Sequence, residues 1–170
     1  MAGNNSICNG AIQWGIENER YAIGCVEKIT KKKVDQCGLF IHESGALAAT
    51  PDGLIENDTI VEVKCPFSFR KEHEEEKILK ESGLENRNGK YFMTRKSKYY
   101  DQVQMQMFVT SRKFCAFLIW TPKKSYFCNV DYDTEWNTEM PRLIDFYFTI
   151  VLPLLLQKVF PTVAVQPTTS

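Results

Sequence analysis

The sequence lacks a surplus of charge of either sign, because 21 Lys and Arg residues balance 21 Asp and Glu residues. Composition therefore gives no support for a nucleic-acid partner, although a local basic groove can exist within a neutral total. The six cysteines are scattered, with no Cys-x-x-Cys pair and no close Cys/His cluster. This arrangement argues against a zinc site and against a disulfide framework.

Targeting and membrane signals are also lacking. The N-terminal stretch MAGNNSICNGAIQWG has no basic region followed by an apolar one, so we expect an intracellular protein, nuclear or cytoplasmic, in a reducing environment. The most apolar run, 143–160, is interrupted by Asp145, Pro153, Gln157 and Lys158, whereas a membrane-spanning helix needs about 20 apolar residues. This run predicts a buried helix that bends or restarts at Pro153.

What is present is typical of one globular domain over residues 1–170, with 44% apolar and 25% charged residues. Hydrophobic periodicity predicts helices and strands in the following order. They are a helix over 11–30, strands over 39–43, 46–49 and 60–65, a helix over 97–111, strands over 114–120 and 125–130, and the helix over 143–160. The order favours an α/β fold with a central mixed sheet and a frayed tail over 161–170.

The first predicted helix carries an acid on its apolar side. Ile12, Ile16, Ile23 and Val26 recur at helical spacing, and Glu19 falls on the same stripe. The pattern alone favours a Glu19 side chain that reaches solvent from the edge of the stripe.

A charged insert over 71–98 separates the strands from the second long helix. Its acidic first part predicts a helix, and its second part, 87–98, contains basic residues and no acid. The basic part could face phosphates, so the insert is a candidate lid or DNA-contacting arm. Its basic residues are Arg87, Lys90, Arg95, Lys96 and Lys98.

The second long helix has two distinct faces. Tyr100, Val103 and Met107 form an apolar stripe, while Gln102 and Gln106 lie on another face, one turn apart.

The most informative stretch contains two acids and a lysine. A Pro-Asp-Gly turn presents Asp52, and a strand then presents Glu62 and Lys64 on one face. Two carboxylates with a strand carbonyl form an oxygen site suited to Mg²⁺ or Mn²⁺, which would polarise a phosphodiester and activate water. Lys64 could hold that water and stabilise developing charge. Because Pro-Asp-Gly is also an ordinary turn and Glu-Val-Lys an ordinary alternating strand, the spacing alone leaves both interpretations open.

Four separated sequence motifs favour the metal-site interpretation over that of an ordinary turn and strand. Residues 14–22 read Gly-x-x-x-Glu-x-x-Ala from Gly15 onward, 50–54 read Thr-Pro-Asp-Gly-Leu, 62–67 read Glu-Val-Lys-Cys-Pro-Phe with Arg70 following, and 99–104 read Tyr-x-x-Gln-Val-Gln. On these motifs the sequence resembles the phage lambda exonuclease and YqaJ-like branch of the PD-(D/E)xK nucleases. The resemblance implies the restriction-endonuclease-like fold of that superfamily, with a central mixed sheet flanked by helices.

The resemblance also implies a role for each matching residue. Asp52 and Glu62 would bind Mg²⁺ or Mn²⁺ together with the Val63 carbonyl, and Glu19 would assist the metal site. Lys64 would orient or activate the attacking water.

Three further residues match the family outside the metal site. Gln102 matches its active-site glutamine, and Tyr99 and Arg70 match positions near the DNA path. Tyr99 and Arg70, with the basic residues Arg95, Lys96 and Lys98, are the predicted DNA-binding set, whereas Gln102 belongs with the predicted catalytic residues.

The sequence departs from the family before its first helix. Members usually carry a helical segment there with an Ile-Thr-Ala-Ser-like motif that helps to bind the DNA terminus, and nothing before Trp14 resembles it. We therefore expect cleavage to depend less on a 5′-phosphate than the resemblance suggests.

The function predicted from the sequence is metal-dependent hydrolysis of DNA phosphodiesters, by a double-strand exonuclease used in recombination, repair or viral replication. The predicted partners are linear DNA ends and either further copies of the chain or a recombination protein. The alternative is a non-catalytic DNA-binding or assembly module that retains the nuclease fold. Its support is the neutral charge and the unmatched N-terminal segment.

Overall fold

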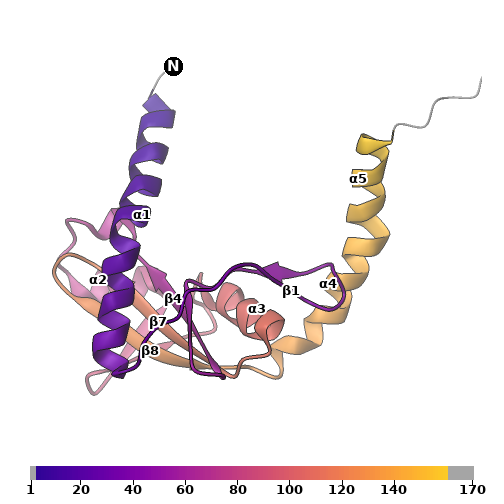
Figure 1. Cartoon of the computed structure of the whole chain (residues 1–170). Coiled ribbons are helices and arrows are strands. Elements are labelled where there is room, and N and C mark those ends of the chain that lie inside the picture. Colours follow the sequence, from indigo (N-terminus) through magenta and orange to yellow (C-terminus); the bar gives the residue numbers. More distant parts are fainter. Residues whose placement is uncertain (1–2, 161–170) are drawn as a thin grey trace, which may run out of the picture.

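The computed structural model describes residues 3–160 of the chain (Figure 1). Its elements are α1 Gly3–Thr30, β1 Phe40–Ile41, β2 Ala48–Ala49, β3 Gly53–Ile55, β4 Thr59–Lys64, η1 Phe67–Phe69, α2 Glu75–Ser82, β5 Leu84–Arg87, β6 Lys90–Met93, α3 Tyr100–Thr110, β7 Phe114–Trp120, β8 Ser125–Asp131, η2 Trp136–Glu139, α4 Met140–Phe146, the π-helical turn η3 Tyr147–Val151, and α5 Leu152–Val159.

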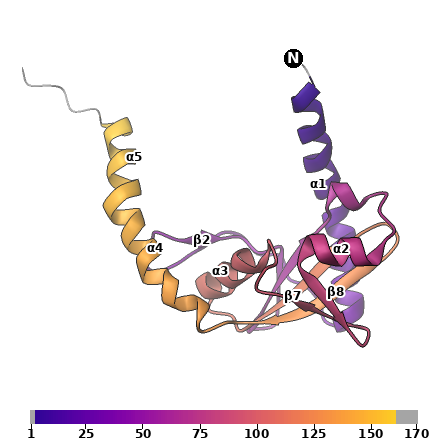
Figure 2. The same ribbon diagram turned by 180° about the vertical axis from the view of Figure 1, so that it is seen from behind.

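A four-stranded mixed sheet forms the centre of the molecule, in the order β3-β4-β7-β8. Strands β4 and β7 are parallel, whereas β3 and β8 run antiparallel to their neighbours. Helix α1 packs on one face, and α2 and α3 pack on the other, as Figures 1 and 2 show from opposite sides. The α/β fold with a central mixed sheet flanked by helices is therefore confirmed.

Strand β4 positions the central acid, and its side chains alternate between the two faces as predicted. Val61 and Val63 are buried in the cluster that includes Val26 of α1. Ile60 is buried in the opposite cluster, beneath α3. Glu62 shares that second face, so a charged side chain points into the layer between β4 and α3.

The strands expected over 39–43, 46–49 and 60–65, which the order of short strands and turns suggested as a meander, do not form one sheet. Strands β1 and β2 form a separate two-stranded sheet, and β4 pairs instead with β3. Strand β3 was not predicted because it begins at Gly53, within the Pro-Asp-Gly sequence, which is typical of a turn.

Helix α1 begins at Gly3 rather than near Ala11, and only part of the predicted stripe is buried. Val26 is fully buried, whereas Ile12 and Ile16 are 57% and 64% exposed. The N-terminal half of α1 extends past the edge of the sheet (Figure 1). Within it Trp14 meets the rings of Phe67 and Trp120, whereas Ile12 and Ile16 stay exposed.

The charged insert is packed against the body. Its acidic part forms α2, as predicted, but its basic part contributes the hairpin β5–β6, which the sequence did not indicate. Leu84 is buried in the core, Tyr91 and Met93 pack against it, and the Tyr91 ring meets Tyr126 of β8 edge-to-face. The hairpin is therefore part of the packed structure rather than a separate lid.

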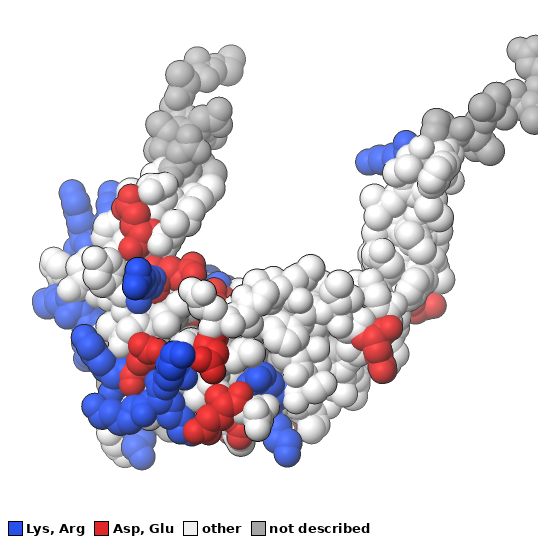
Figure 3. Space-filling model, in the orientation of Figure 1, with Lys and Arg blue, Asp and Glu red and all other residues white. Residues whose placement is uncertain are grey.

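The C-terminal apolar run is helical but not buried, which corrects the prediction. It leaves the body as α4, η3 and α5, with Pro153 in the first turn of α5, where a missing N–H costs least (Figure 1). Figure 3 shows this arm as mostly uncharged surface. Its large apolar side chains are 45–71% exposed, namely Phe146, Phe148, Ile150, Leu154, Leu155, Leu156, Val159 and Phe160.

Periodicity could not predict this exposure, because it shows that a helix is apolar and not whether another element covers it. Among the described residues, no helix combines the length and apolarity that a membrane crossing requires. The tail 161–170, predicted to be frayed, lies outside the described residues.

Candidate active site

The first acid, Asp52, lies at the point where the chain enters β3. Its backbone N–H donates to the Val61 carbonyl at 3.0 Å, which extends the β3–β4 ladder by one residue. Its carboxylate oxygen Oδ2 accepts the Val63 N–H at 2.7 Å. Since the N–H and C=O of one strand residue point to the same edge, the Val63 carbonyl also faces the Asp52 end of β3.

Close packing, rather than a turn conformation, explains why residue 53 is a glycine. A Cβ atom at this position would lie 2.3 Å from the Val34 side chain and 3.2 Å from the Asp35 carbonyl oxygen. Asp35 exchanges backbone hydrogen bonds with Leu54, so the segment after α1 crosses close over β3. Glycine at 53 permits that approach and thereby holds Asp52 against β4.

The second acid, Glu62, is held by three donors beneath α3. It is 2% exposed. The amide Nε2 of Gln102 donates to its Oε1 at 2.8 Å, and the Nε2 of Gln106 donates to its Oε2 at 2.8 Å. The Lys64 ammonium lies 2.5 Å from Oε1. These contacts satisfy the rule that a buried charge must be hydrogen-bonded and paired.

Gln106 lies in the candidate site, but the sequence predicted no role for it. The available signal was its position one helical turn after Gln102, on the same face of the helix. Because the contact joins residues 44 positions apart in the chain, its partner could not be identified before the α3–β4 packing was known.

The two acids influence each other electrostatically. The pKa of Asp52 is raised from 3.8 to about 7, chiefly by burial and then by the charges of Glu62 and Glu19, against the opposing effects of the Val63 N–H and Lys64. A pair of carboxylates held this way attracts a positive partner, because a cation removes the repulsion between them.

This raised pKa predicts a pH-dependent stability for the metal-free protein. The unfolded chain releases the Asp52 proton near pH 3.8, whereas the folded chain keeps it until about pH 7. The folded state therefore binds more protons in that window, so stability falls as the pH rises through it. Melting temperatures in EDTA should show this fall in the wild type and a smaller one in Asp52→Asn.

The exposed Asp58, at the other end of β4, provides the matched control, since Asp58→Asn should follow the wild-type curve. Parallel wild-type and Asp52→Asn curves across this window would contradict the raised pKa of Asp52.

Glu19 faces the same side of the molecule from α1. It lines a groove of about 580 Å³ together with Arg20, Glu27 and Asp52. Within residues 3–160, however, no three His, Cys, Asp or Glu side chains approach closely enough to hold a metal ion together. Glu19 thus shares the groove with Asp52 without joining Asp52 and Glu62 in one cluster.

The donors at this site fit a hard divalent cation. Two carboxylates and the Val63 carbonyl are the oxygen donors that Mg²⁺ and Mn²⁺ prefer. Burial and, second to it, the charge of Glu62 raise the pKa of Asp52, and a bound cation would relieve the repulsion between the two acids. Lys64 is a quarter exposed and can reach a molecule bound at the site.

The predicted DNA-binding residues divide into two groups. Tyr99 lies beside the site, with its ring 5.6 Å from the Lys64 ammonium and 5.1 Å from that of Lys98. Burial raises the pKa of Tyr99 to about 12, so its phenol stays neutral. Lys96 and Lys98 are exposed.

Arg70 and Arg95 are already engaged by the protein. The Arg70 guanidinium stacks 3.7 Å from the Phe67 ring centre and donates to the Phe67 carbonyl at 2.8 Å. The Arg95 guanidinium lies 2.7 Å from carboxylate oxygens of both Asp133 and Glu135.

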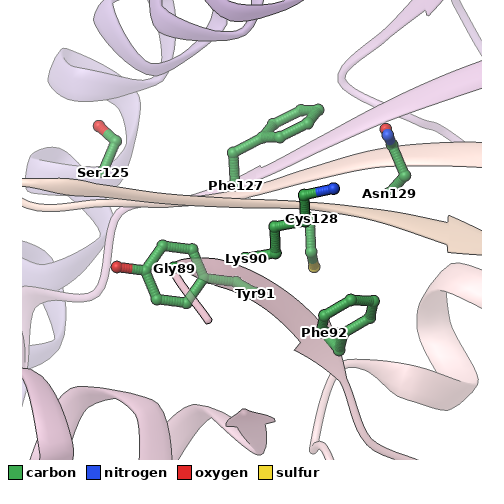
Figure 4. A pocket seen from close by; sticks show the side chains of 8 residues that line it. All are labelled: Gly89, Lys90, Tyr91, Phe92, Ser125, Phe127, Cys128 and Asn129. Carbon is green, nitrogen blue, oxygen red and sulfur yellow. The ribbon is translucent and has the colours of Figure 1, made fainter. Parts of the chain in front are cut away.

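A separate pocket of about 450 Å³ lies between β6 and β8, as Figure 4 shows. It is lined by Tyr91, Phe92, Phe127 and Asn129, among others, and none of the predicted catalytic residues contributes to it. Asp52 and Glu62 therefore lie outside this pocket, in a different part of the fold.

Comparison with known proteins gives a family and a fold. The model of the YqaJ-like viral recombinase domain family matches residues 2–113. Among solved structures, LHK-Exo in complex with dAMP is 22% identical, with a TM-score of 0.68, and the match covers 88% of this chain and 74% of that one. LHK-Exo, an alkaline exonuclease from Laribacter hongkongensis, matches in a second structure with 20% identity and a TM-score of 0.66, over 88% and 72% of the two chains. No curated protein matches the sequence.

Proposed function

The chain belongs to the family of YqaJ-like viral recombinase domains, and from that premise we propose that it is a metal-dependent DNA nuclease. The proposed activity is that of a double-strand exonuclease used in recombination, repair or viral replication. The observation that carries the proposal is that Asp52 is bound to the Val63 N–H, one residue after Glu62 on β4, while Lys64 is bound to Glu62.

In this proposal Asp52, Glu62 and the Val63 carbonyl hold Mg²⁺ or Mn²⁺. When bound, such an ion polarises the scissile phosphodiester and makes a water molecule more acidic. Glu19, across the groove from Asp52, adds negative charge that favours cation binding and can accept a hydrogen bond from water at the site.

Lys64 and Gln102 act on the reacting groups. The Lys64 ammonium, anchored by Glu62, donates hydrogen bonds to the attacking water and to the phosphoryl oxygens as their negative charge grows. Gln102 holds one oxygen of Glu62 and is itself exposed, so its amide can also contact the nucleotide. Together these residues orient water and phosphate for hydrolysis.

We place the DNA backbone along Tyr99, Lys98, Lys96 and Arg70. The Tyr99 ring lies next to the Lys64 ammonium and also contacts the Lys98 ammonium, so a strand that reaches the acids would pass over Tyr99 and near Lys98. The neutral Tyr99 phenol can donate a hydrogen bond to a phosphate oxygen, and the lysines supply the charge.

Salt dependence tests this placement. Neutralising Lys96 and Lys98 together should weaken DNA binding and reduce the slope of log affinity against log salt by about 0.9 per lost phosphate contact. Arg95→Gln should change the slope less, because Asp133 and Glu135 already neutralise Arg95. Fluorescence anisotropy with a short duplex in EDTA measures both without cleavage. An unchanged affinity and slope in the double lysine variant would assign these residues to solvation alone.

A protein partner is also proposed, either further copies of the chain or a recombination protein. The support is the row of exposed apolar side chains on α4, η3 and α5, since contiguous apolar surface of this kind is typical of protein contacts.

Digestion of DNA of two topologies tests the proposed function. End-labelled linear duplex should be degraded in Mg²⁺ or Mn²⁺ and remain intact in EDTA, while closed circular DNA should resist in both. Binding of duplex without cleavage in either ion would favour the non-catalytic module instead. Cleavage of closed circles would establish a nuclease but contradict the exonuclease mode.

A further inference from the structure

Helix α3 carries two fully buried glutamines whose hydrogen-bonding differs. Gln104 donates from Nε2 to the Asp131 carbonyl at 3.0 Å and accepts the Asp133 N–H through Oε1 at 2.8 Å. Both ends of this amide tie α3 to the end of β8, as expected for a structural residue.

Gln106 is satisfied at one end only. Its Nε2 donates to Oε2 of Glu62, whereas its Oε1 is buried with no hydrogen-bond partner within the described part of the chain. Leaving a buried acceptor unpaired is costly, and a flipped amide would direct that acceptor at a carboxylate. The contact with Glu62 is therefore the one interaction that accounts for a glutamine here.

The contact fixes the orientation of the carboxylate. Gln102 and Lys64 both hold Oε1 of Glu62, and Gln106 holds Oε2, so the carboxyl plane cannot rotate without breaking a bond on each side. Gln102 and Lys64 are accessible and can move when substrate arrives, whereas Gln106 is 4% exposed and cannot contact substrate.

We infer that Gln106 is a positioning residue that holds Glu62 in the orientation required to bind the divalent ion. This inference rests on the proposed function, because it assigns the ion to Glu62. It also explains why α3 carries glutamines one turn apart: the exposed Gln102 holds Oε1 of Glu62 and the buried Gln106 holds Oε2. Partners that orient metal ligands in this way typically contribute 10–100-fold to metal affinity or activity.

The test compares the two buried glutamines, with the metal alone as the probe. Gln106→Met preserves volume but removes the donor, so Mn²⁺ affinity measured by calorimetry without DNA should fall by about 10–100-fold. Gln104→Met is the matched control. It should lower the melting temperature while leaving Mn²⁺ affinity within about threefold of the wild type, since it changes no ligand or ligand partner.

A second variant covers the case in which Gln106→Met folds poorly. Gln106→Asn keeps an amide but is one methylene too short to reach Glu62, so it should lose Mn²⁺ affinity to a similar extent. In steady-state cleavage both Gln106 variants should lower kcat with little change in KM, because Gln106 does not touch DNA.

The outcomes separate the two claims. If the wild type binds Mn²⁺ and either folded Gln106 variant binds it equally well, Gln106 is structural and the inference fails. An equal loss of affinity in Gln104→Met would also overturn it. If the wild type itself binds no Mn²⁺, the proposed function fails first.

Discussion

Asp52→Asn and Glu62→Gln are each expected to abolish metal binding and turnover together. Each change replaces a charged oxygen ligand with a neutral amide. Asp52 lies just before the start of β3, and Glu62 lies within the neighbouring strand β4. Several kcal/mol of transition-state stabilisation are lost with the ion, so single-turnover cleavage should fall about 10³-fold or more. Calorimetry with Mn²⁺ and cleavage of one duplex measure both effects.

Asp58→Asn provides the control for these variants. Asp58 is exposed in the turn between β3 and β4, where its carboxylate accepts a hydrogen bond from the Thr59 hydroxyl at 2.8 Å. Its replacement makes the same chemical change outside the site and should leave both measurements unaltered. Wild-type cleavage by Asp52→Asn or Glu62→Gln would refute the metal-site assignment.

Lys64→Ala is expected to separate metal binding from catalysis. Lys64 contributes no ligand oxygen, so the variant should still bind Mn²⁺, while its turnover should fall on the order of 10²–10³-fold, as for other groups that stabilise developing charge. Lys64→Arg should restore little activity, because a planar guanidinium cannot place one donor where the ammonium lay beside Glu62.

Lys32→Ala is the matched control for Lys64. Lys32 also pairs with a carboxylate, at 2.8 Å from Glu56, but this pair lies on the surface at the end of α1. Its loss should leave turnover within about twofold, in keeping with the small contribution of exposed ion pairs. If Lys64→Ala cleaves at the wild-type rate, Lys64 has no catalytic role, and Glu-Val-Lys is only an ordinary alternating strand.

Local pattern predicted the parts of the site that lie within one strand. The two-residue period of β4 placed Glu62 and Lys64 on one face. The ladder that brings Asp52 to that strand was not predicted, because β3 was not recognised in the sequence. The resemblance added Gln102, whose contact with Glu62 spans 40 residues and follows from no local period.

What could not be predicted depends on tertiary packing. The close approach of Val34 to Gly53 explains why the Pro-Asp-Gly segment needs a glycine, and no rule for turn sequences predicts that approach. The contact between Gln106 and Glu62 requires the relative placement of α3 and β4. The exposure of the C-terminal arm depends on which surfaces lie near it, whereas hydrophobicity alone favoured burial.

Anomalous diffraction from crystals soaked in Mn²⁺ shows whether Asp52 and Glu62 hold a divalent ion between them. We expect one strong anomalous peak between the Asp52 and Glu62 carboxylates, about 2.0–2.6 Å from an oxygen of each, and its disappearance in Asp52→Asn crystals. A peak bound elsewhere with none between these acids, or a peak that survives Asp52→Asn, would contradict it.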